Sequence, residues 1–135
     1  YRAYDRTWNL ETPGKAVIAC SNDPGLGGDP SRHNPEDLLV AALSSCHMLW
    51  YLHLCAAAGV TVVSYADTAA GEMAMHKDGS GEFVKVTLHP RIELAPGSDA
   101  DKARALHGEV HKFCFIARSV NFPVAVEPQI AFAAP

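Results

Sequence analysis

Two of the four cysteines in this 135-residue sequence stand in contexts that suit thiol chemistry. Cys46 lies within an apolar run that begins after Asn34, and Cys114 lies near the end of a second helical pattern. Two thiols on separate elements can form a dithiol that is oxidised and reduced in turnover. A cysteine among apolar neighbours is otherwise inert, because burial raises the pKa of its thiol. The residues around Cys46 leave both interpretations open.

Histidines accompany both cysteines. His107, His111 and Cys114 follow one another at i, i+4 and i+7, which predicts that they share one helix face. Together with Cys46, such a stripe could bind zinc. His47 directly follows Cys46, but neighbouring helical side chains point about 100° apart. An arginine from elsewhere in the chain is therefore a better activator of the Cys46 thiol.

Glu36 precedes Cys46 by ten residues. On one helix this spacing is about 15 Å, so Glu36 must act through an intermediary or in another subunit's site. It could equally be only a negative charge that stabilises the helix N-terminus. Cys20 and Cys55 have apolar neighbours and no chemical motif, and we expect them to be packing residues.

Composition narrows the class of protein. Charged residues make up 19% of the chain and hydrophobic residues 48%. The usual charged share is about 25%, so we expect apolar surface to remain on the folded chain. A partner subunit would ordinarily cover such surface. The net charge is −4 and no basic stripe is present, so nucleic-acid binding is not expected. The cysteines form no C-x-x-C pair or dense disulfide framework, which indicates a reducing cytoplasm.

The N-terminus and the longest apolar segment bear on targeting and membrane association. The sequence begins with Tyr1 rather than Met, which leaves open whether residues precede it, and no signal peptide is visible. Residues 38–60 are apolar enough for a membrane span. They include Ser44, His47 and His53 and no closely flanking lysine or arginine. We therefore expect a buried core helix and no membrane association.

Local patterns predict one α+β domain over residues 1–135. Asn34 is a good N-cap with Pro35 at the first helical position, and Gly59 is a good terminator, which predicts one long helix between them. Because this helix is apolar on all sides, we expect it to be wrapped on all sides. The other expected elements are strands at 4–10, 15–20, 61–73 and 82–94, a helix at 99–114 and a last strand near 124–128. Turns at 12–14 and 77–81 predict two hairpins.

Two segments resemble the OsmC/Ohr family of osmotically inducible and organic-hydroperoxide-resistance proteins. They are the run from Asn34-Pro-Glu-Asp to Cys46-His-Met-Leu and the later run His111-Lys-Phe-Cys114-Phe-Ile-Ala-Arg. The resemblance implies an OsmC-like fold, with antiparallel sheets around a long central helix. It also implies an intertwined homodimer whose sites draw on both chains. Phe115 stands where better-known members have proline, and His47 suggests a less-studied OsmC-like branch.

The resemblance also implies roles for particular residues. Cys46 would be the peroxidatic thiol and Cys114 the resolving thiol, with an external dithiol as reductant and no metal or cofactor. An arginine held by Glu36 would stabilise the Cys46 thiolate. Arg6 is the first choice for that arginine, and Arg2 and Arg32 are the alternatives.

The sequence thus predicts a cytoplasmic, homodimeric thiol peroxidase that reduces organic hydroperoxides. Two other functions stay open. One is a non-catalytic protein that binds a small hydrophobic or electrophilic ligand in the same pocket. The other is a zinc-binding domain that uses Cys46, His111 and Cys114.

Overall fold

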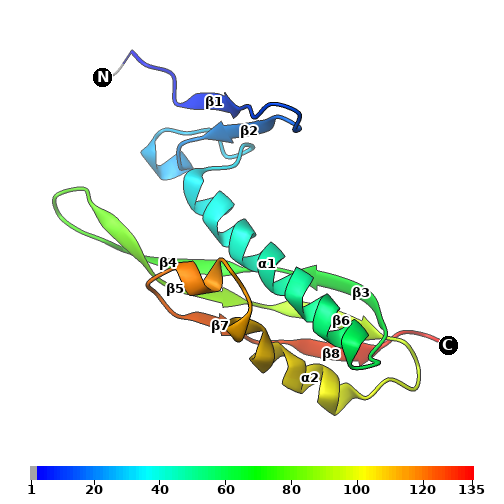
Figure 1. The fold of residues 1–135 in the computed structure, drawn as a ribbon. Coiled ribbons are helices and arrows are strands. Elements are labelled where there is room, and N and C mark those ends of the chain that lie inside the picture. Colours follow the sequence, from blue (N-terminus) through cyan, green and yellow to red (C-terminus); the bar gives the residue numbers. More distant parts are fainter. Residues whose placement is uncertain (1–2) are drawn as a thin grey trace. The chain divides into compact units, whose positions relative to one another are not determined.

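A computed structural model describes residues 3–135. Arg2, one of the alternative arginines, lies outside the described residues. The chain divides into two compact units. The first ends at Leu39, and the second runs from Val40 to Pro135. Helices and β-sheets occur in the order expected for the α+β class, which is confirmed (Figure 1). A single domain over residues 1–135 stays a prediction.

The first unit contains a β-hairpin. Strands β1 (Thr7–Leu10) and β2 (Ile18–Ser21) pair antiparallel, with Thr7 opposite Ser21. This confirms the predicted hairpin, although both strands are shorter than predicted. Arg32 fastens the hairpin to the loop that follows it, because its guanidinium donates to the carbonyl oxygens of Cys20 and Trp8, each at 2.8 Å.

The long helix α1 (Pro35–Ala57) begins and ends as predicted. The Asp37 N–H donates to Asn34 Oδ1 at 2.7 Å, and the Asn34 N–H donates to Asp37 Oδ2 at 3.1 Å. This reciprocal pair is a capping box that satisfies two amides at the helix start. At the other end Gly59 has a φ of +76°, and the Val60 N–H donates to the Cys55 carbonyl at 2.9 Å. Glycine permits this left-handed turn, which ends the helix.

The second unit contains two three-stranded sheets. One has the order β3 (Val62–Asp67), β6 (Pro90–Leu94) and β8 (Gln129–Phe132), and the other has the order β4 (Ala70–Met75), β5 (Gly81–Leu88) and β7 (Val124–Val126). The β3–β6 and β4–β5 pairs are antiparallel, whereas β7 and β8 join β5 and β6 in parallel. The sheets are therefore mixed, and the last strand predicted from the sequence is two strands.

Each long strand predicted at 61–73 and 82–94 is also broken in two. The breaks face each other, because Asp67 Oδ1 accepts the backbone N–H of His89 at 2.7 Å where the sheets divide. Pro90 follows and has no N–H to continue the ladder of β5. The predicted hairpin is confirmed. Its part next to the turn is the β4–β5 pair of one sheet, and its part far from the turn is the β3–β6 pair of the other sheet.

The helix α2 (Ala100–Glu109) is shorter than predicted. Asp99 caps its start by accepting the Lys102 N–H at 3.0 Å. A 3-10 turn at Val110–Lys112 replaces its expected last turn, soon after Gly108, a residue that weakens helices. Cys114 follows this turn and is not on the helix. The prediction that the second helix reaches Cys114 is therefore wrong.

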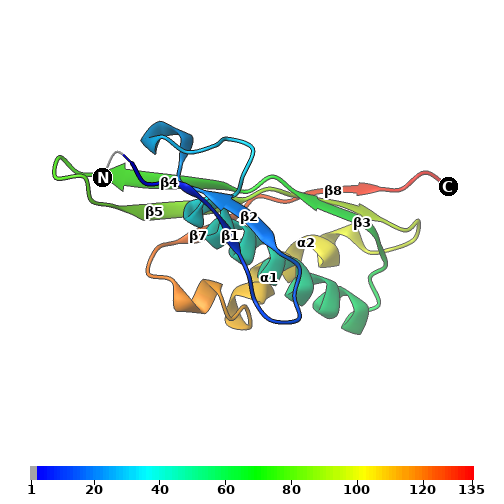
Figure 2. The ribbon, with the colours of Figure 1, turned by 90° about the horizontal axis from the view of Figure 1, so that it is seen from above.

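In the second unit α1 and α2 lie on the same side of the strands (Figure 2). One face of α1 is buried. Its residues are spaced every four positions: Leu43, His47, Tyr51 and Cys55. The other faces are less covered by this chain, and Leu49 is 64% exposed. The expectation of a helix wrapped on all sides is not met within one chain. By length and composition alone, α1 is also the one described helix that could cross a membrane, a test that core helices of soluble proteins pass as well.

Candidate functional site

The fold of the second unit brings the two predicted thiols together. Cys46 projects from α1, and Cys114 follows the 3-10 turn after α2. Cys46 packs against the core cluster that contains Cys114 and lies close enough for its thiol to raise the pKa of Cys114. Both cysteines are free thiols. Two residues 68 positions apart in the sequence thus become neighbours, which is the arrangement that a dithiol needs.

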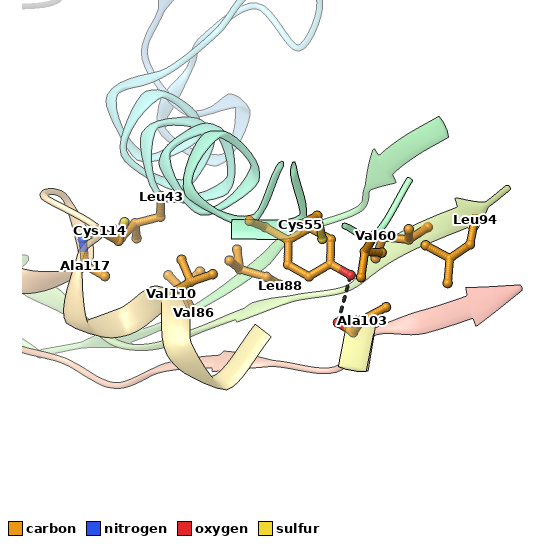
Figure 3. Close-up of a cluster of buried hydrophobic side chains, with 12 residues drawn as sticks. Leu43, Cys55, Val60, Val86, Leu88, Leu94, Ala103, Val110, Cys114 and Ala117 are labelled. Carbon is orange, nitrogen blue, oxygen red and sulfur yellow. Dashed lines mark hydrogen bonds between the residues drawn. The ribbon is translucent and has the colours of Figure 1, made fainter. Parts of the chain in front are cut away.

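The environments of the two thiols differ. Cys114 is 1% exposed and lies beside Leu43 at one end of the core (Figure 3). Burial raises the pKa of the Cys114 thiol, and the Cys46 thiol raises it further, while the backbone amide of Ala117 opposes this by donating to Cys114 Sγ at 3.4 Å. Cys46 is only partly buried. Cys46 is therefore the more accessible sulfur, and Cys114 stays a protonated thiol near neutral pH.

Aromatic side chains adjoin the thiol pair. Trp50 lies one helical turn after Cys46, and its ring stacks on Phe113 with centroids 5.1 Å apart. Phe115 meets the edge of the same indole at 5.9 Å. Phe113 is 40% and Phe115 is 70% exposed, so these rings present apolar surface to solvent next to Cys114. Such a surface suits an organic ligand better than a small hydrophilic one.

A buried pair of histidines is the main feature that sequence reasoning missed. His47 Nε2 and His107 Nδ1 are 2.9 Å apart, and the two imidazole rings are nearly coplanar, at 4°. Both histidines are 5% exposed. The signal for His47 was its place four residues after Leu43 and four before Tyr51, on the stripe that the core covers. No local signal indicated that His107 would face it from α2.

Both histidines are neutral near pH 7. Burial lowers the pKa of His47 to about 4, against a smaller opposing effect of the Asp67 carboxylate. Burial also lowers the pKa of His107 to about 3, with smaller contributions in the same direction from His47 and Arg104. A neutral imidazole has one N–H and one bare nitrogen. One ring therefore donates to the other, and each ring has its second nitrogen available.

A small cavity of about 30 Å³ lies between the histidine pair and Cys114. Cys114, His47 and His107 line it together with apolar side chains from α1 and the sheet. His107 Nε2 is fully buried and has no hydrogen-bond partner among the described residues. The site therefore contains an unsatisfied polar atom near the less accessible sulfur.

The zinc site considered from the sequence is not formed. His111 is exposed, whereas His107 and Cys114 are buried, because the 3-10 turn ends the regular helical spacing. Within residues 3–135 no group of three or more histidine, cysteine, aspartate or glutamate side chains could hold a metal ion. The prediction of a zinc-binding domain is wrong for this arrangement.

Glu36 and the candidate arginines belong to the first unit. Glu36 Oε2 is buried and has no hydrogen-bond partner within the described part of the chain. Arg6 lies over the Tyr4 ring, with its guanidinium carbon 4.3 Å from the centroid. The Arg32 side chain already holds the hairpin by three hydrogen bonds. This occupation favours Arg6 over Arg32, and the joint action of Arg6, Glu36 and Cys46 stays a prediction.

Comparison with known proteins identifies the family. The model of the family described as OsmC-like protein matches residues 28–129. An OsmC-like protein of unknown function from Vibrio cholerae O1 biovar eltor has a similar structure, with a TM-score of 0.85 and 32% identity over 94% of this chain and 86% of its own. The chain therefore belongs to the OsmC-like protein family. No curated protein sequence matches it significantly.

More distant structures share the fold. An organic hydroperoxide resistance protein from Elizabethkingia anophelis is 21% identical, with a TM-score of 0.72, over 95% of this chain and 90% of its own. An organic hydroperoxide resistance protein from Legionella pneumophila is 18% identical, with a TM-score of 0.65, over 98% of both chains. At these identities the likeness concerns the fold alone.

Proposed function

We propose that this protein is a thiol peroxidase that reduces organic hydroperoxides with Cys46 and Cys114. The proximity of the two cysteines carries the proposal, because a peroxidatic and a resolving cysteine must lie near each other. Membership of the OsmC-like family supports it. So do the names of two structural neighbours, which are organic hydroperoxide resistance proteins.

The reaction has three steps. The Cys46 thiolate attacks the distal oxygen of the hydroperoxide, the O–O bond breaks, and the alkoxide takes a proton and leaves as an alcohol. Cys46 is then a sulfenic acid. The Cys114 sulfur attacks the Cys46 sulfur, which forms a disulfide and releases water. An external dithiol reduces this disulfide and is itself oxidised to a disulfide.

The first step needs a positive charge beside the Cys46 sulfur. We assign this role to an arginine, Arg6 in the first instance, oriented by the Glu36 carboxylate. A guanidinium held by a carboxylate can stabilise a thiolate and polarise the peroxide oxygens at the same time. The unpartnered Glu36 Oε2 is the atom available for this ion pair.

The surroundings of the thiols favour an organic substrate. Trp50, Phe113 and Phe115 offer an apolar surface that can bind the hydrocarbon part of a peroxide. The exposed faces of α1 also support a homodimer, because apolar side chains such as Leu49 lack cover in a single chain. Free cysteines suit a reducing cytoplasm, where a dithiol reductant is available.

The proposal is tested by one equivalent of cumene hydroperoxide added to the reduced protein. We expect rapid formation of a Cys46–Cys114 disulfide, located by mass spectrometry of peptides. Cys46→Ser should abolish peroxide consumption, and Cys55→Ser, a change of another cysteine on the same helix, should leave it unaltered. Slow loss of thiols without pairing would instead indicate the non-catalytic ligand-binding protein.

A further inference from the structure

The histidine pair has one end inside the core and one end toward its edge. His107 Nε2 is the inner end, fully buried and unpartnered among the described residues. His47 Nδ1 is the outer end, and it is not among the buried polar atoms that lack a partner. The two rings are joined in the middle by the 2.9 Å contact between His47 Nε2 and His107 Nδ1. Four ring nitrogens thus form a path across the pair.

His107 and Cys114 border a shared space. Both residues line the cavity of about 30 Å³, and one water needs only about 10–15 Å³ of such volume together with at least two polar partners. His107 Nε2 and Cys114 Sγ supply two partners. A water at this place would satisfy the nitrogen that has no partner among the described residues, which removes the cost of burying an unpaired polar atom.

We propose that the His47–His107 pair is a proton relay for Cys114, connected to its thiol by a water in this cavity. The inference rests on the proposed function, because it assigns the pair to the step in which Cys114 attacks the Cys46 sulfenic acid. His47 and His107 are then positioning and proton-transfer residues for the resolving step. They have no part in the attack of Cys46 on the peroxide.

The resolving step conserves every proton. Cys46–SOH and Cys114–SH become the disulfide and one water. The Cys114 proton passes through the bridging water to His107 Nε2, the His107 Nδ1 proton passes to His47 Nε2, and the His47 Nδ1 proton leaves the pair. The hydroxide displaced from Cys46 takes up one proton. Reduction of the disulfide by the external dithiol returns a proton to Cys114 along the reverse path.

The charges around the pair suit a relay in which neither histidine ring becomes an imidazolium. Asp67 acts on His47 from the sheet, and Arg104 acts on His107 from α2. Tyr51 covers the face of the His107 ring at a centroid distance of 3.8 Å. Burial keeps both rings neutral, and in a neutral pair each ring gains a proton on one nitrogen as it loses one from the other. The exposed His111 is the remaining titratable group that lines the cavity.

His107→Phe tests the relay, since phenylalanine can keep the stack on Tyr51 but has no ring nitrogens. After a peroxide pulse we expect Cys46 sulfenic acid, trapped with dimedone, to form at the wild-type rate. Disulfide formation should slow by about 10²-fold, the usual size of a general acid–base contribution. Its rate should also keep rising to higher pH than in the wild type, because Cys114 must then ionise directly into solvent. His76→Gln, a change of an exposed histidine paired with Glu82, should alter neither step.

A second measurement separates this inference from the proposed function. In a Cys46→Ser background, the ultraviolet absorbance of the Cys114 thiolate is titrated with and without His107→Phe. We expect the Cys114 titration to move to higher pH in the variant, and this holds whether or not the protein reduces peroxides. His107→Gln serves if His107→Phe does not fold, and its disulfide step should slow as well. An unchanged disulfide rate together with an unchanged Cys114 titration would overturn the relay.

Discussion

The Tyr51 ring stacks on the His107 imidazole with centroids 3.8 Å apart and planes inclined by 11°. The Tyr51 hydroxyl also donates to the Ala103 carbonyl oxygen at 2.8 Å, four residues earlier on α2 (Figure 3). One side chain of α1 therefore fixes both the orientation of His107 and the position of the helix that carries it. Burial of this hydroxyl also raises the pKa of Tyr51, so it donates at every physiological pH.

We expect Tyr51→Phe to lower the free energy of unfolding by about 1–2 kcal/mol, because the Ala103 carbonyl loses its donor within the core. Urea denaturation measures this change. Tyr65→Phe is the matched control, since the Tyr65 hydroxyl is buried without a partner among residues 3–135. Its removal should leave stability unchanged or raise it. Equal losses in both variants would show that the Tyr51 hydrogen bond contributes nothing specific.

Replacement of single cysteines should separate the chemical steps. Cys114→Ser should reduce one equivalent of hydroperoxide and then stop with Cys46 as a sulfenic acid, because the partner for the disulfide is absent. Cys20→Ser and Cys55→Ser should sustain turnover, since both sulfurs are buried and neither belongs to the proposed thiol pair. Mass spectrometry and peroxide consumption provide the readouts. Strong loss of activity in either of the last two variants would mean that the wrong sulfur has been assigned.

Stability should fall in acid because of the histidine pair. The folded-state pKa values of about 4 for His47 and about 3 for His107 lie below the ordinary value of 6.5. Between these values the unfolded chain binds more protons than the folded chain, so the free energy of unfolding decreases as pH falls below 6.5. The slope is about 1.4 kcal/mol per pH unit for each histidine that stays neutral.

Urea denaturation from pH 7.5 to pH 4.5, a range of about three units around the ordinary histidine pKa, measures this loss. A His47→Phe/His107→Phe double variant should have a flatter dependence than the wild type over the same range. His76→Gln should follow the wild type, because His76 is exposed. Parallel curves for the wild type and the double variant would contradict the neutral, buried pair.

Glu36 and Asp37 provide a contrast between activity and stability. Glu36→Ala should slow peroxide reduction with little loss of stability, because its buried Oε2 has no partner in the described chain that folding depends on. Asp37→Ala should cost about 1 kcal/mol of stability and leave the rate unchanged, since it removes one half of the capping box. Steady-state kinetics and thermal unfolding distinguish them. A destabilised Glu36→Ala protein with an unchanged rate would reduce Glu36 to a helix-terminal charge.

The same contrast applies to the arginines. Arg6→Ala should slow peroxide reduction, whereas Arg32→Ala should mainly loosen the β1–β2 hairpin, because it removes three hydrogen bonds to that hairpin. Peroxide kinetics at matched concentrations of folded protein make the comparison. If Arg32→Ala alone lost activity while remaining folded, the activating cation would be Arg32.

Local signals in the sequence predicted the elements that local physics determines. The α1 ends followed from Asn34 and Gly59, since a cap and a left-handed glycine act within a few residues. The two hairpins followed from their turns. The broken strands were missed, because the break depends on Asp67 meeting the His89 amide across the sheet. The early end of α2 was missed because helix-forming residues continue past Gly108.

The site was predicted in the same uneven way. Cys46 and Cys114 could be singled out because their segments resemble a known family, and the fold places the two residues near each other. The His47–His107 pair could not be found from spacing, because 60 residues separate its members and only tertiary packing joins them. His107 also appeared to belong with His111 in a zinc stripe, a pattern that depended on a helix longer than α2.

Asp67 fixes the position of α1 along its axis relative to the sheets. Its second oxygen, Oδ2, accepts the Ser44 hydroxyl at 2.5 Å, while Oδ1 holds the His89 amide where the sheets divide. A slide of the helix by one turn, about 5.4 Å, would break the Ser44 contact and carry Cys46, two residues further on, past its sulfur neighbour. A carboxylate outside the thiol pair thus fixes where Cys46 lies along the helix axis relative to the sheets.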